Sequence, residues 1–155
     1  MNQLVRQQGY KRAGWHGWDW FYNATGSGSF MDGHYSTRVV PELQDITVGD
    51  KVFINPAVSH LVAIDEKPSV FALYNGGDAS ESAQATTAST SWVWVTKPLG
   101  PNRTRLILRI RGDMRGQGAF VAWLFDNPLD FGGALFADKT LNGIKATAEA
   151  LVAGR

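Results

Sequence analysis

Alternation of apolar and polar positions predicts an antiparallel sheet through the middle of the chain. Val58, His60, Val62 and Ile64 share one face of a predicted strand, and a turn at 65–68 joins it to a second at 70–74. Further strands are predicted at 51–54, directly after a tight turn at Gly49-Asp50, and at 91–96 and 105–111. Residues 100–102 (GPN) form the turn between the last two strands. These segments predict consecutive antiparallel strands.

The period changes from two to that of a helix after residue 118. A short helix is expected at 120–124, and a long one starts at Pro128, which suits a first helical turn, and runs to about residue 152. Its buried stripe recurs at spacings of three and four, through Ala134, Ala137, Leu141, Ile144, Ala148 and Leu151. Shorter helices are expected at 2–8 and around 18–23, and a loop poor in core residues at 76–88.

An antiparallel sheet followed by one long helix predicts an α+β fold in which the sheet curls around the C-terminal helix. The 155 residues, of which 44% are hydrophobic, are enough for one domain with one core, so we assign residues 1–155 to a single domain.

Composition removes several classes of function. The chain has no cysteine, which excludes disulfides, thiolate catalysis and iron–sulfur clusters. A net charge of +1 supplies no global field for nucleic acid, so we expect no nucleic-acid partner. The N-terminal residues lack the apolar run of a signal peptide, and no run is long enough for a membrane span. We therefore expect a cytoplasmic protein that does not insert into membranes.

Aromatic side chains are unusually dense near the N-terminus, where Trp15, Trp18, Trp20 and Tyr22 fall within eight positions. Such rings either anchor an irregular loop on the core or line an apolar ligand pocket. The first half of the long helix carries small residues, among them Gly133 and Ala137. Interiors are close-packed, so that volume is filled by neighbouring side chains, water or a ligand.

Several motifs together resemble bacterial START-like (SRPBCC, polyketide-cyclase-like) proteins. They are residues 9–15 (GYKRAGW), 18–20 (WDW), 38–45 (RVVPELQD), 91–95 (SWVWV) and 128–131 (PLDF), and the resemblance extends over most of the chain. The resemblance implies a helix-grip fold, with a curved antiparallel sheet around a long C-terminal helix and a cavity for hydrophobic or aromatic small molecules. Such proteins usually begin with a strand before the first helix, and we expect that strand to be missing here. The sheet edge would then be covered by another element, paired with a second copy or left by a shortened version of the fold, and of these we favour a homodimer.

Acid–base chemistry has a candidate pair in His34 with Glu42 or Asp45, because an imidazole and a carboxylate beside an apolar cavity can move protons. Glu42 and Asp45 equally suit hydrogen bonds that fix their loop, with Arg38 as an ion partner. The three histidines show no metal-binding spacing, so we expect neither a metal nor an organic cofactor. Basic residues cluster from 97 to 115, and Arg109 either lies on the solvated outer face of its strand or faces the ligand and pairs with a carboxylate or phosphate.

Three functions are consistent with these features. The first is binding of a hydrophobic or aromatic small molecule between sheet and helix. Its wall would be formed by Trp15, Trp18, Trp20, Trp94, Gly133 and Ala137, and its polar contacts by His34, Glu42 or Arg109. The second is a cyclase, hydrolase or hydratase on the same fold that uses His34 and Glu42. The third is an interaction protein whose core is filled by its own side chains.

Overall fold

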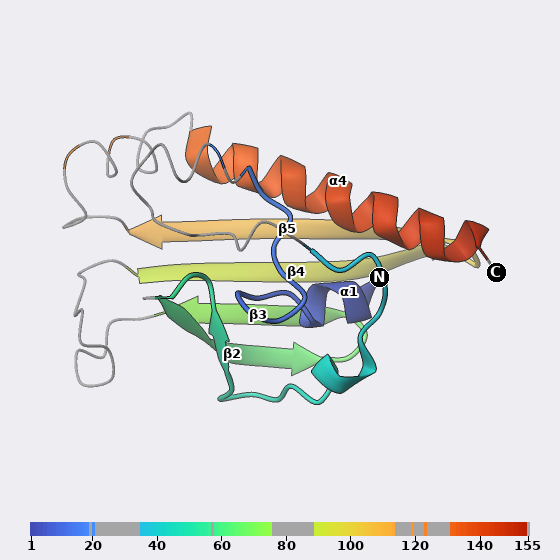
Figure 1. Ribbon diagram of the computed structural model, residues 1–155, viewed down its shortest axis with the longest axis horizontal. Helices are drawn as coiled ribbons and strands as arrows, with labels where there is room; N and C mark the ends of the chain where they lie inside the picture. The colour runs from blue at the N-terminus through green and yellow to red at the C-terminus, as the bar shows by residue number, and fades with distance from the viewer. Residues whose placement is uncertain are drawn as a thin grey trace.

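The computed structural model describes residues 1–18, 20, 35–56, 58–75, 89–113, 119, 123 and 131–154. The elements, labelled as in Figure 1, are α1 (Asn2–Arg6), the short 3-10 helix η1 (Pro41–Leu43), β1 (Lys51–Phe53), β2 (Ser59–Glu66), β3 (Val70–Asn75), β4 (Ser89–Gly100), β5 (Arg103–Asp113) and α4 (Phe131–Ala153). His34, the predicted loop at 76–88, the predicted helix at 120–124 and most of the predicted helix at 18–23 lie outside the described residues.

The strands form one antiparallel sheet in the order β1-β2-β3-β4-β5, each paired with its neighbour along the chain. This confirms the predicted succession of antiparallel strands and the α+β class. The last two strands are longer than predicted, because they pair from Ser89 with Asp113 to Gly100 with Arg103 at the turn, with one shift of register between Pro98 and Gly100. Figure 1 shows α4 running along β5, with α1 in front of β3.

The two faces of the sheet differ in burial. One row across the strands joins Val62, Leu73, Trp92 and Ile110, and we call its side the inner face. The core gathers between this face, α1 and α4, and contains Leu4, Val5, Trp15, Ile46, Val52, Ile54, Val62, Phe71, Leu73, Trp92, Trp94, Phe136 and Ile144. The row that joins Leu61, Tyr74, Ser91 and Arg111 belongs to the opposite, outer face.

A β-bulge corrects the predicted face of β2. The pairing with β3 shifts between Val62 and Ile64, so that Ala63 is an extra residue. Ile64 consequently lies opposite Ala72 on the outer face and is 40% exposed, instead of sharing the buried face with Val62. The same shift turns Asp65 to the inner face, opposite the buried Phe71.

The buried stripe of α4 also differs from the predicted one. Phe136, Thr140, Ile144 and Thr147 are buried, whereas Ala134 is exposed. The hydrophobic pattern did not predict that the two threonines are buried. A threonine can nevertheless bury its methyl group when its hydroxyl donates to a backbone carbonyl. Thr140 does so, since its Oγ1 donates to the carbonyl of His16 at 2.9 Å.

Candidate functional site

A cluster of rings on the inner face surrounds Trp92 of β4. Trp15, which follows Gly14, meets it edge-on with ring centroids 5.2 Å apart. Phe136 of α4 lies 4.8 Å from it, and the imidazole of His60 from β2 lies 5.3 Å from it. The cluster therefore joins the N-terminal segment, two strands and the start of the long helix.

The rings continue along β4 to Trp94. Its centroid is 6.0 Å from that of Trp92 and 6.0 Å from that of Phe71. Trp94 is only 1% exposed, and its indole Nε1 finds no hydrogen-bond partner among the described residues. A buried donor without an acceptor costs free energy, about 1–3 kcal/mol by analogy with other buried polar groups.

His60 places a polar group inside this cluster. Its Nε2 shares a hydrogen bond with the hydroxyl of Thr90, at the start of β4. Burial lowers the pKa of His60 to about 4, and the nearby backbone of Ser59 opposes that shift only in part. The imidazole is therefore neutral near pH 7, and its Nδ1 makes no hydrogen bond of acceptable geometry in the described structure.

A second buried histidine, His16, lies against α4. A Cβ added at Gly143 would stand 2.9 Å from the Cβ of His16 and closer still to its ring, so the helix admits this histidine only because residue 143 has no side chain. Tyr35 contacts the imidazole, with centroids 4.0 Å apart. Burial, and secondly the charge of Lys139, lower the pKa of His16 to about 4. Its Nδ1 is also buried without a partner among the described residues.

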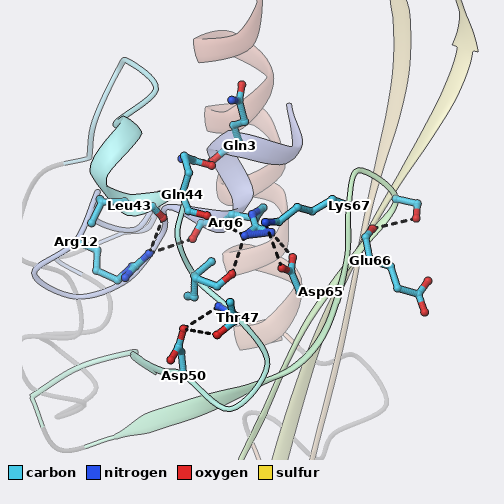
Figure 2. Close-up of polar contacts among 12 residues, drawn as sticks. Gln3, Arg6, Arg12, Leu43, Gln44, Thr47, Asp50, Asp65, Glu66 and Lys67 are labelled. Atoms are coloured by element: carbon cyan, nitrogen blue, oxygen red, sulfur yellow. Dashed lines mark hydrogen bonds and ion pairs between the residues drawn. The ribbon is translucent and has the colours of Figure 1, made fainter.

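Figure 2 shows how the segment after η1 is attached to α1. The guanidinium of Arg6, 2% exposed, pairs with Asp65 and donates to the carbonyls of Gln44 at 2.9 Å and Ile46 at 2.8 Å. Arg12 donates to the carbonyl of Leu43 at 3.0 Å. Arginine is suited to this role because its planar fork carries several donors in fixed directions. These bonds fix the irregular segment across the inner side of the sheet.

The structure brings only part of the predicted site together. Trp15 and Trp94 are in the ring cluster. On α4, Gly133 is buried and Ala137 is half-buried, on either side of Phe136 in sequence.

The other predicted residues lie apart from the cluster. Trp18 is 38% and Trp20 is 68% exposed, and Lys139 lies over the ring of Trp18 with its Nζ 4.5 Å from the centroid. Glu42 is exposed on η1. Arg109 pairs with Val93, and both belong to the outer face. Trp94, the next residue of β4, belongs to the inner face, so Arg109 points away from it. This placement matches the solvated-face alternative for Arg109.

Comparison of the chain with protein-family models, curated proteins and solved structures finds no match. Within the described part of the chain, no helix is both long and apolar enough to cross a membrane, and no three metal-ligating side chains gather in one place.

Proposed function

We propose that this chain binds a hydrophobic or aromatic small molecule on the inner face of the sheet, between the Trp92 cluster and the first turns of α4. The proposal includes the helix-grip arrangement that the START-like resemblance implies. Small-molecule sites typically combine apolar and aromatic walls with a few well-placed polar groups. The rings of Trp15, Trp92 and Phe136 provide such a wall, with the imidazole of His60 beside it.

The observation that carries the proposal is the set of buried polar atoms with unused hydrogen-bonding capacity around these rings. Nε1 of Trp94 and Nδ1 of His60 are buried without partners among the described residues, whereas the unpartnered Nδ1 of His16 lies against Gly143 of α4, outside this cluster. Native proteins rarely leave such atoms unpaired. A bound molecule that carries a carbonyl or hydroxyl oxygen would satisfy one or more of them. Because burial keeps the imidazole of His60 neutral, the site favours an uncharged molecule.

Titration with N-phenyl-1-naphthylamine, an uncharged aromatic fluorophore, tests this placement. We expect saturable fluorescence enhancement with the wild-type protein. Gly133→Leu places a large side chain at a buried position one turn before Phe136, and we expect it to weaken binding at least about tenfold. Ala134→Leu adds the same bulk at the exposed neighbouring position and is the matched control.

Equal affinity of Gly133→Leu and Ala134→Leu would contradict the placement. No saturable binding to the wild-type protein would instead favour the interaction-protein alternative, in which the chain's own rings fill the core. Thr90→Val, which removes the hydroxyl bound to His60 at nearly constant volume, is a second and gentler variant. It should alter the probe's affinity while thermal unfolding confirms that the variant is folded.

A further inference from the structure

The outer face of the sheet combines exposed apolar side chains with a row of positive charges. Register places the two kinds of residue on the same side: Ile64 shares a row with Arg109, and Leu61 and Tyr74 share the next with Arg111. Leu61, Ile64 and Ile107 are each 40% exposed and Tyr74 is 47% exposed. Large apolar side chains exposed together on one face mark an interaction surface more often than single exposed ones do.

The charges on this face are strongly one-sided, although the chain as a whole carries only +1. Register places six cationic residues on the outer side of the strands, Lys51, Lys97, Arg103, Arg105, Arg109 and Arg111, against two acidic residues, Glu66 and Asp113. Arg105 and Arg111 are six residues apart on one strand, so the basic row is roughly 20 Å long. A negatively charged, extended partner complements such a row.

We propose that the outer face binds the surface of a bilayer that contains anionic phospholipid. Guanidinium groups pair well with lipid phosphates, and basic residues close to an anionic leaflet each add to the attraction. The apolar side chains over β2 and β3 would contact the boundary between headgroups and acyl chains. This association is peripheral, and it places the ligand-binding inner face on the side of the sheet away from the lipid.

Other occupants fit this face less well. A second copy of the chain would bring another six cations to the interface, with only Glu66 and Asp113 of the outer register positions from each copy to neutralise them. Single-stranded nucleic acid requires planar rings for its bases to stack on. Tyr74 and Phe53 are the exposed rings among the described residues of this face, whereas Leu61, Ile64 and Ile107 are aliphatic and suit acyl chains better than bases.

Co-sedimentation with vesicles tests the proposal. We expect the wild-type protein to bind vesicles of phosphatidylcholine mixed with an equal amount of phosphatidylglycerol and not to bind phosphatidylcholine alone. Arg105, Arg109 and Arg111 changed together to Gln should weaken binding roughly 100-fold, since each basic residue contributes about fivefold. The control changes Lys11, Lys139 and Lys145 to Gln, which removes the same charge away from the outer face and should change binding less than about fivefold.

A salt titration of the wild-type protein needs no variant. Binding should weaken steeply as the Debye length falls from about 10 Å in 0.1 M salt to about 3 Å in 1 M salt. Equal binding to neutral vesicles, binding to neither kind, an equal loss in the lysine control, or binding to oligothymidylate without binding to vesicles would each overturn the proposal. None of these outcomes bears on the fluorophore site, because that site is on the inner face.

Discussion

His60 shows how burial decides the chemistry of one residue. Its ring lies beside Trp92 and its Nε2 is bonded to the Thr90 hydroxyl, so a positive charge there would lose solvation without gaining a carboxylate. Burial accordingly lowers its pKa to about 4 from the ordinary 6.5. A neutral imidazole at this point offers one donor and one acceptor nitrogen, which suits recognition of an uncharged polar atom.

The depressed pKa of His60 makes the stability of the protein depend on pH. Between the unfolded pKa of 6.5 and the folded pKa of about 4, the unfolded chain binds the proton and the folded one does not, so stability falls as pH falls through this range. We expect the free energy of unfolding, measured with urea, to fall by about 2 kcal/mol more for the wild type than for His60→Gln when the pH is lowered from 7 to about 4.5. Parallel stability curves for the two proteins would show that His60 is not buried as a neutral group.

At the scale of the elements, the order of the strands and the presence of the C-terminal helix could be predicted from the sequence. The rotation of α4 about its axis and the register of β2 with β3 could not. Period-two alternation located the strands, because it depends on side chains that simply alternate between two faces. In β2 the alternation is interrupted at Ala63, the extra residue of the bulge, and nothing in the sequence distinguishes a bulge there from regular pairing. Thr140 and Thr147 take core positions of α4 because of what faces them, which a hydrophobicity pattern does not contain.

The bulge has an energetic consequence through Asp65, which it turns inward to pair with the buried Arg6. Asp65→Asn keeps the shape but leaves the Arg6 charge without its carboxylate, and we expect it to lower the free energy of unfolding by about 3 kcal/mol. Glu66→Gln, at the exposed next position, removes the same charge and should change it by less than about 0.5 kcal/mol. Similar urea midpoints for the two variants would show that the Arg6–Asp65 pair does not stabilise the fold.

Across the whole molecule, the candidate site was only partly visible in the sequence. The ring positions Trp15 and Trp94 were identified because large aromatic side chains dominate cores and pockets alike. Phe136, Thr90 and the buried role of His60 depend on which strands and helix turns meet, so they required the fold. The charge distribution was hidden for a related reason: a net charge of +1 averages a basic outer face with carboxylates on other surfaces, such as Asp138 and Glu149 on α4.

That separation of charge predicts a chromatographic behaviour that net charge does not. A protein of net charge +1 near pH 7 with evenly mixed charges should pass through a sulfonate cation exchanger almost unretained. The row on β5 presents several guanidinium groups to a planar anionic matrix at once, so we expect retention that ends only as added salt screens the row. Arg105, Arg109 and Arg111 changed to Gln should elute at clearly lower salt than Lys11, Lys139 and Lys145 changed to Gln, although both variants carry the same net charge. Co-elution of the two variants would mean that the outer face has no dominant field, and a membrane surface would then have no electrostatic reason to prefer it.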